Sequence, residues 1–218
     1  TAHTYEIYGP LVNGVTEVIF EGTPNTPHYG RHFEVIERYG VTNYYTAPTL
    51  IRSLMGAFPD GPEPGKYDFS SVRLLGSVGE SINPQAWKWL RKHVGGGTAS
   101  FIDTWWQSET GSTICSPRPH DPAFAPEGTF PEGTPHCTPL PGCATREVPG
   151  VSVRVVDEHG DFVEPGKQGF IVVDKIGPSM ARTVWGDPQR YLNSYWKHYG
   201  TRGWFLAGDG AKVDDEGN

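Results

Sequence analysis

The stretch DTWWQSETG, residues 103–111, places two tryptophans beside side chains that carry hydroxyl, amide and carboxylate groups. Tryptophan is costly to expose to water, whereas Gln, Ser and Glu are costly to bury without hydrogen-bond partners. Two explanations are open at this point. The stretch is either a core strand that runs into a polar turn, or one wall of a pocket whose ligand has an apolar part and an ionic part.

Two further segments place polar groups among glycines. The segment GSVGES, residues 76–81, lacks the third glycine of a dinucleotide-binding fingerprint and the Gly-Lys-Ser/Thr ending of a phosphate-binding P-loop. Asp209 stands between Gly208 and Gly210. It is either a turn residue or a carboxylate held out to accept hydrogen bonds from ligand hydroxyls.

Nucleophilic and zinc chemistry find little support in the sequence. It contains no GxSxG or HExxH motif, and its eight histidines are scattered. Cys137 and Cys143 could serve as zinc ligands together with His120 and His136, but their spacing fits no standard paired-cysteine pattern. The total of three cysteines is odd, which favours free thiols in a reducing compartment over a disulfide framework.

The first half of the chain alternates β-rich and amphipathic segments. We expect strands at 16–20, 41–46, 72–75 and 99–102, with helices at 32–39, 48–57 and 83–94. Gly40 is placed to end the first of these helices, and Asn83 followed by Pro84 is placed to begin the last. This repetition predicts the α/β class, a parallel sheet with covering helices.

The polar segments follow the predicted strands. Residues 46–49, 76–81 and 103–111 each come directly after a strand. In open parallel sheets, ligands bind outside the carboxyl ends of the strands, where such loops converge. Three polar segments on one edge therefore favour the pocket-wall explanation of DTWWQSETG.

The second half has a different composition. Residues 117–149 are rich in Pro and Gly, which is typical of a long connecting loop. Strands are expected at 151–157, 169–175 and 203–213, and a short helix at 187–196. We therefore predict an α/β subdomain at 1–120, a connecting loop or insertion at 121–150, and a smaller, truncated, mostly antiparallel β lobe at 151–218.

Composition excludes several classes. Among 218 residues, 36% are hydrophobic and 20% charged, as in globular proteins. A net charge of −7 without a block of Lys or Arg argues against a nucleic-acid partner. No apolar run approaches the roughly 20 residues of a membrane span, and no secretion leader is visible, so we expect a cytoplasmic protein with no membrane partner.

Five segments, in order, resemble the acetyl-CoA synthetases of the adenylate-forming superfamily, which also holds luciferases and nonribosomal-peptide adenylation domains. They are YGPLVNGVTEVIFEGTP (8–24), YYTAPTLIRSLM (44–55), LLGSVGESINPQAW (74–87), DTWWQSETG (103–111) and WFLAGDGAKVDDEGN (204–218). The resemblance covers nearly the whole chain except residues 119–139, which look like an insertion. It implies a ligase that activates acetate with ATP and Mg²⁺, and then transfers the acetyl group to CoA.

The resemblance also implies roles for individual residues. The adenine side would be lined by Gly79, Glu80 and Ser81, the last standing where the family usually has Pro. Ser108, where the family usually has Thr, would meet the α-phosphate, and Glu109 would help to hold Mg²⁺. The remaining roles are an adenylate-binding wall of Asp103, Thr104, Trp105, Trp106 and Gln107, a ribose acceptor at Asp209, and an acyl pocket of Thr1, Val78 and Trp106, whose indole limits the acyl chain.

The family's other parts are expected outside the chain: a phosphate loop before residue 1, and a hinge and lysine-bearing domain after Asn218. We therefore expect the isolated chain to have no ligase activity and to act only with the rest of a parent chain. Two alternatives stay open. One is a propionyl-, acetoacetyl- or other short-chain acyl-CoA synthetase. The other is a non-catalytic binding module that retains the fold, against which the presence of Glu109, Asp209 and both tryptophans argues.

Overall fold

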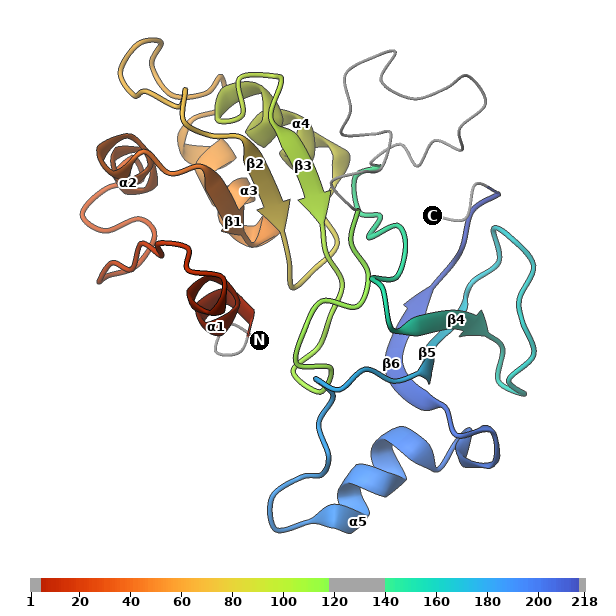
Figure 1. Ribbon diagram of the computed structural model, residues 1–218. Coiled ribbons are helices and arrows are strands. Elements are labelled where there is room, and N and C mark those ends of the chain that lie inside the picture. The colour runs from red at the N-terminus through yellow and green to blue at the C-terminus, as the bar shows by residue number, and fades with distance from the viewer. Residues whose placement is uncertain (1–4, 118–139, 216–218) are drawn as a thin grey trace. The chain divides into compact units, whose positions relative to one another are not determined.

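The computed structural model describes residues 5–117 and 140–215, which form two compact units (Figure 1). The α/β unit contains residues 15–104 and 140–144, and the β unit contains residues 5–14, 105–117 and 145–215. The boundary expected near residue 120 lies outside the described residues.

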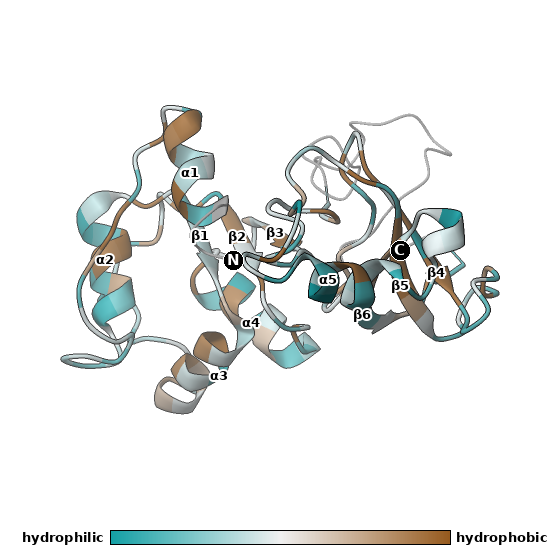
Figure 2. Ribbon diagram, turned by 90° about the horizontal axis from the view of Figure 1, so that it is seen from below, coloured by the Kyte–Doolittle hydropathy of each residue, from teal (hydrophilic) through white to brown (hydrophobic). Residues whose placement is uncertain are grey.

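The α/β unit is built on a parallel sheet. Its strands are β1 (Asn43–Thr46), β2 (Leu74–Ser77) and β3 (Ser100–Asp103), in the order β1-β2-β3. The helices are α2 (Arg31–Tyr39), α3 (Pro48–Ala57) and α4 (Pro84–His93), and α3 and α4 cover one face of the sheet (Figures 1 and 2). The predicted parallel sheet with covering helices is confirmed.

Local sequence explains where these helices begin and end. The Asn83 side chain accepts a hydrogen bond from the Ala86 N–H at 2.8 Å, which satisfies a donor that the first turn of α4 leaves open. Gly40 adopts the left-handed conformation (φ 56°) at the end of α2. The apolar faces of the helices then meet the sheet in one core, whose completely buried members include Phe33, Ile51, Leu54, Leu75 and Leu90.

The strand predicted at residues 16–20 is wrong. The segment forms no strand, and its backbone makes no hydrogen bond to the backbone of another segment among the described residues. β-rich composition forms a strand only where a partner strand supplies the ladder. Ile19 is largely exposed as a result, while the ring of Phe20 packs edge-on against His32. Helix α1 (Tyr5–Val12), in the β unit, was not predicted.

The β unit contains the antiparallel sheet expected for the second half. Its strands are β4 (Ser152–Val156), β5 (Gly169–Lys175) and β6 (Phe205–Ala211), with β5 in the centre. Between β5 and β6 lie helix α5 (Pro188–Tyr191), a π-helix (Leu192–Trp196) and a 3₁₀ turn (Gly200–Arg202). The mostly antiparallel lobe is confirmed. Figure 2 shows β4 and β5 as mainly hydrophobic, as strands that bury a face must be.

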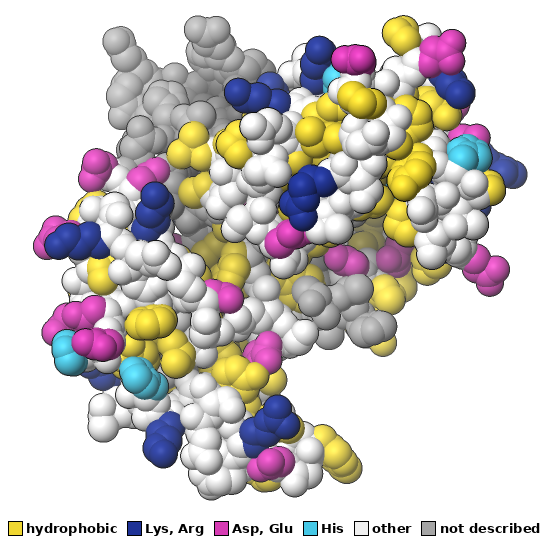
Figure 3. All heavy atoms as spheres, turned by 180° about the vertical axis from the view of Figure 1, so that it is seen from behind, with side chains coloured by type: hydrophobic (Ala, Val, Ile, Leu, Met, Phe, Trp, Pro, Cys, Tyr) yellow, Lys and Arg dark blue, Asp and Glu magenta, His cyan; other side chains and the backbone are white. Residues whose placement is uncertain are grey.

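The distribution of surface charge and the length of the helices bear on the partner classes considered from the sequence. On the face shown in Figure 3, basic side chains alternate with acidic ones over both units rather than gathering into a patch. Among the described residues, no helix is both long and apolar enough to cross a membrane.

Candidate functional site

The three strand ends of the α/β unit lie side by side, as the loop positions predicted. Thr46 is in register with Ser77, and Ser77 is in register with Asp103. The Ser77 hydroxyl donates to the Asp103 carboxylate at 2.7 Å, and the Thr104 hydroxyl donates to the Ser77 carbonyl at 3.0 Å. The Tyr45 hydroxyl lies 2.5 Å from the Thr104 hydroxyl. Polar groups of all three strands therefore meet at one edge of the sheet.

The loop after β2 begins with a buried residue and continues with exposed ones. Val78 is buried, its N–H donating to the Thr46 carbonyl at 3.1 Å, whereas Gly79, Glu80 and Ser81 are exposed. Gly79 has a φ of 91°, which a residue with a side chain rarely adopts, so the turn depends on this glycine.

Glu80 is held by α3. One carboxylate oxygen accepts from the Thr49 N–H at 2.8 Å and from the Thr49 hydroxyl, and the other accepts from Arg52 at 3.0 Å. Hydrogen bonds from the Thr49 hydroxyl and then from Arg52 lower the pKa of Glu80. The sequence predicts a role for Thr49 only within the segment 46–49, and none for Arg52. The spacing of the two residues could have indicated their joint role, since residues three apart lie on one helix face.

Asp103 is a buried carboxyl in this unit. Burial raises its pKa to about 6, against the smaller opposing effect of the Ser77 hydrogen bond. A carboxyl with a raised pKa binds its proton more tightly when the protein is folded. Its contribution to stability is therefore complete below about pH 4 and is lost as the pH rises to about 6.

Replacement of Asp103 by Asn should remove this pH dependence. A shift of about two pKa units corresponds to roughly 2–3 kcal/mol, so Asp103→Asn should be more stable than the wild type by up to that amount at pH 7. At pH 4 the two should differ little. Urea unfolding between pH 4 and 8 measures the difference, with the exposed Asp60→Asn as the charge-matched control. Equal pH profiles for the wild type and Asp103→Asn would contradict this assignment.

The remaining residues of the stretch lie in the β unit and form a tight turn. Trp105 pairs with Cys115 through backbone hydrogen bonds of 2.9 and 3.1 Å. Between them, the Gln107 N–H donates to the Thr110 hydroxyl at 2.9 Å, and the Thr110 N–H donates to the Gln107 carbonyl at 3.1 Å. This turn leaves Ser108 exposed and Glu109 half-buried, so both side chains are accessible to a ligand.

Asp209 is brought to this turn across about 100 positions of sequence. One of its oxygens, Oδ2, accepts from the Trp105 indole at 3.0 Å and from the Gln107 amide at 2.8 Å, while the same amide also donates to the Ala207 carbonyl at 2.8 Å. No described residue donates to the second oxygen, Oδ1. Asp209 thus has one oxygen fixed by Trp105 and Gln107 and one available to an external donor.

A bulge in β6 accounts for the position of Asp209. Phe170 pairs with Gly210, but Val172 pairs with Leu206, so β6 holds two extra residues at this point. Gly208, in the bulge, has a φ of 81°. Bulges re-aim side chains beside functional sites. The alternative of a simple turn aspartate is therefore wrong, since Asp209 lies in a strand.

The surroundings of Glu109 fit a role as one ligand of an Mg²⁺ ion whose other ligands come from substrate phosphates and water. Its Oε1 accepts from the Tyr195 hydroxyl at 2.5 Å, and no described residue donates to its Oε2. The described part of the chain holds no group of three or more His, Cys, Asp or Glu that could bind a metal without help. Mg²⁺ commonly takes one or two carboxylates and completes its shell with substrate phosphates and water, which suits a single carboxylate of this kind. The hydrogen bond to Glu109 raises the pKa of Tyr195.

The predicted acyl-pocket residues are distributed over separate parts. Val78 belongs to the α/β unit, Trp106 to the β unit, and Thr1 lies outside the described residues. Val78 and Trp106 are both buried, at 8% and 7% exposure, yet neither belongs to the apolar clusters of the described residues. Of the alternative zinc ligands, His120, His136 and Cys137 also lie outside the described residues.

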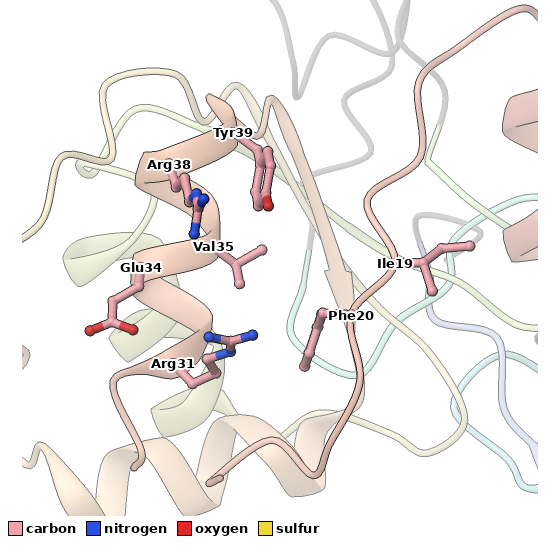
Figure 4. Close-up of a pocket in the computed structure, with 7 residues that line it drawn as sticks. All are labelled: Ile19, Phe20, Arg31, Glu34, Val35, Arg38 and Tyr39. Atoms are coloured by element: carbon pink, nitrogen blue, oxygen red, sulfur yellow. The ribbon is translucent and has the colours of Figure 1, made fainter. Parts of the chain in front are cut away.

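A surface pocket of the α/β unit contains none of the predicted residues. In Figure 4, Arg31 and Phe20 lie close together at one end of it, while Glu34 points away. The Arg31 guanidinium lies 5.9 Å from the centre of the Phe20 ring. Sequence reasoning gave these residues no role.

Comparison with known proteins agrees with the resemblance. The family model "AMP-binding enzyme" matches residues 1–185. The chain is 48% identical to an acetyl-coenzyme A synthetase of Mycolicibacterium smegmatis and 49% identical to one of Mycobacterium tuberculosis H37Rv, in each case over its whole length. It covers only 22% and 32% of these two relatives, so it spans less than a third of their length.

Solved structures show the fold. The crystal structure of the anthranilate CoA ligase AuaEII in complex with anthranoyl-AMP superposes with a TM-score of 0.71, at 23% identity, over 94% of this chain and 33% of that chain. The α/β sheet followed by an antiparallel lobe is thus part of the adenylate-forming ligase fold. Together with the family match over most of its length, this shows that the chain belongs to the AMP-binding enzymes.

Proposed function

We propose that this chain forms the adenylate-binding part of an AMP-forming acetate–CoA ligase. The observation that carries the proposal is the wall formed by residues 105–109 and Asp209. It combines an exposed hydroxyl at Ser108, a carboxylate oxygen of Glu109 and a carboxylate oxygen of Asp209, each accessible to a ligand. An adenylate presents a phosphate, its counter-ion and ribose hydroxyls, which are the groups that such side chains bind.

The proposed reaction has two steps. An acetate oxygen attacks the α-phosphorus of ATP, the bond to the β-phosphate breaks, and pyrophosphate leaves. The sulfur of CoA then attacks the acetyl carbon, the carbon–oxygen bond to the phosphate breaks, AMP leaves and the thiol proton is released. Ser108 would donate to an α-phosphate oxygen, and Asp209 would accept from the ribose. Glu109 would hold Mg²⁺, which supplies charge neutralisation when bound. Such chemistry depends on positioning rather than on a protein nucleophile.

The acyl pocket is proposed at Val78, Trp106 and Thr1, and the adenine side at Gly79, Glu80 and Ser81. The fixed Glu80 carboxylate supports the second assignment, since Thr49 and Arg52 hold the turn in one orientation. Acetate is the proposed acid because a buried indole leaves little space for a longer chain. A cytoplasmic location is part of the proposal, as an odd total of three cysteines argues against a disulfide framework and suits a reducing compartment.

An acid panel tests the function. Full-length protein containing this chain should form a hydroxamate from acetate, ATP and hydroxylamine, more slowly from propionate, and negligibly from acids of four or more carbons. Each methylene discriminates by only about 1–3 kcal/mol unless a wall blocks it, so a sharp cutoff is the informative result. Highest activity with propionate or acetoacetate would make the protein another short-chain synthetase. No activity with any acid would favour a binding module.

The isolated 218-residue chain should form no hydroxamate in the same assay, and no acetyl-CoA when CoA replaces hydroxylamine.

A further inference from the structure

A tyrosine that the sequence did not single out contacts the proposed Mg²⁺ ligand. The Tyr195 hydroxyl donates to Oε1 of Glu109 over 2.5 Å, the only hydrogen bond that a side chain of the described residues makes with this carboxylate. The two residues are 86 positions apart, so the tertiary fold produces the contact. A single donor to one oxygen restricts the rotation of the carboxylate and leaves Oε2 for another ligand.

The ring that carries this hydroxyl is held in place. It stacks on Phe205 with ring centres 5.1 Å apart and an angle of 10° between the planes. Phe205 is completely buried in β6. The Tyr191 ring packs against the Tyr195 ring, with their centres 5.6 Å apart. The hydroxyl cannot leave Glu109 by a ring swing without breaking this stack, which contributes about 0.5–1.5 kcal/mol beyond the buried area.

The backbone at Tyr195 is unusual as well. Residues Leu192–Trp196 form a π-helix that continues α5. Such wide turns are uncommon and occur frequently at functional sites, because they shift the residues after them around the helix. The π-helix therefore sets the direction in which Tyr195 leaves the backbone.

A second tyrosine of the same helix provides a comparison. The Tyr191 hydroxyl donates to the Ala181 carbonyl, also at 2.5 Å, and the Ala181 N–H donates to the Glu109 carbonyl at 2.7 Å. Tyr191 thus anchors the backbone near Glu109 without touching its carboxylate. Loss of either hydroxyl removes one hydrogen bond from the same neighbourhood, but only Tyr195 contacts the proposed metal ligand.

We propose that Tyr195 is a positioning residue, which holds the Glu109 carboxylate in the orientation that binds Mg²⁺ together with the phosphates of ATP. The inference rests on the proposed function in one respect, namely the assignment of Glu109 as a metal ligand. Partners that orient metal ligands usually change metal affinity or activity by about 10–100-fold when they are removed.

The test compares Tyr195→Phe with Tyr191→Phe in the full-length protein. Mn²⁺ serves as the probe, and its binding is followed by electron paramagnetic resonance in the presence of an ATP analogue with a methylene group between the α- and β-phosphates. Tyr195→Phe should weaken Mn²⁺ binding by roughly 10-fold, and Glu109→Gln by at least as much. Tyr191→Phe should have an Mn²⁺ affinity within about twofold of the wild type, even if its melting temperature falls as far as that of Tyr195→Phe.

Equal Mn²⁺ affinity in Tyr195→Phe and the wild type, or an equal loss in both tyrosine variants, would overturn the inference. The readout separates this failure from that of the proposed function. If Tyr195→Phe weakens Mn²⁺ binding as expected but the wild-type protein activates no acetate, the positioning role holds and the proposed acid is wrong. If Glu109→Gln itself binds Mn²⁺ as the wild type does, the metal-ligand assignment fails, and the role of Tyr195 fails with it.

Discussion

Trp106→Gly in the full-length protein is expected to shift the accepted acids from acetate towards chains of about five or six carbons. The indole is 7% exposed and lies outside the apolar clusters, so its removal opens space without dismantling a core cluster. Each added methylene that becomes buried contributes about 0.8 kcal/mol, so three or four of them should raise kcat/KM for the longer acids by roughly 50–200-fold. Activity with acetate should fall, because a small acid no longer fills the pocket.

Hydroxamate formation with acids of two to eight carbons measures this change. The variant should be assayed well below its melting temperature, since removing a buried tryptophan costs about 3–5 kcal/mol where a cavity remains. Trp106→Phe, which keeps most of the bulk, should stay selective for acetate. Trp185→Gly removes an indole that is 98% exposed and should change nothing. An unchanged preference for acetate in Trp106→Gly would remove Trp106 from the acyl pocket.

Gly111→Ala is expected to destabilise the turn that presents Ser108 and Glu109. Gly111 has a φ of 70°, and a Cβ atom there would lie 2.3 Å from the Ser179 carbonyl oxygen, which belongs to the backbone and cannot swing aside. The left-handed conformation alone costs a residue with a side chain about 1–2 kcal/mol, and overpacking adds about 1–3 kcal/mol. Ser179 also donates to the Thr110 carbonyl at 2.7 Å, so its displacement should disturb the turn and reduce ligase activity.

Gly186 provides a matched control in the same unit. Its φ of 73° is nearly the same, but a Cβ atom at this position meets nothing within 4 Å. Gly186→Ala should therefore show only the conformational cost, and urea unfolding of both variants isolates the steric contribution. Equal losses of stability in the two variants would show that the contact with Ser179 relaxes freely.

The helices of the α/β unit could be predicted from sequence because residues at their own ends determine where they begin and end. Asn83 with Pro84 begins a helix and Gly40 ends one, whatever the rest of the chain does. The segment at 16–20 failed for the complementary reason. A strand depends on a neighbour that the local sequence does not describe, and without one this segment stays irregular.

In the candidate site, too, some features follow from local sequence and others depend on residues far apart in the chain. Its position past the strand ends followed from the parallel sheet, and Thr46, Ser77 and Asp103 do lie in register there. The contacts of Glu109 with Tyr195 and of Asp209 with Gln107 join residues 86 and 102 positions apart, and they depend on a π-helix and a bulge. Neither irregularity has a reliable local signature, so the side chains that hold the site were visible only in the structure.

Transfer of oxygen from the acid to AMP tests the central claim most directly. Full-length protein should be incubated with ATP, CoA and acetate labelled with ¹⁸O in both carboxylate oxygens, and the AMP analysed by mass spectrometry. If this chain supports acetyl-adenylate formation, the attacking oxygen remains on phosphorus when CoA breaks the carbon–oxygen bond. Each AMP should then carry one ¹⁸O. Acetate-dependent turnover that yields unlabelled AMP, or that places the label in orthophosphate beside ADP, would contradict the account.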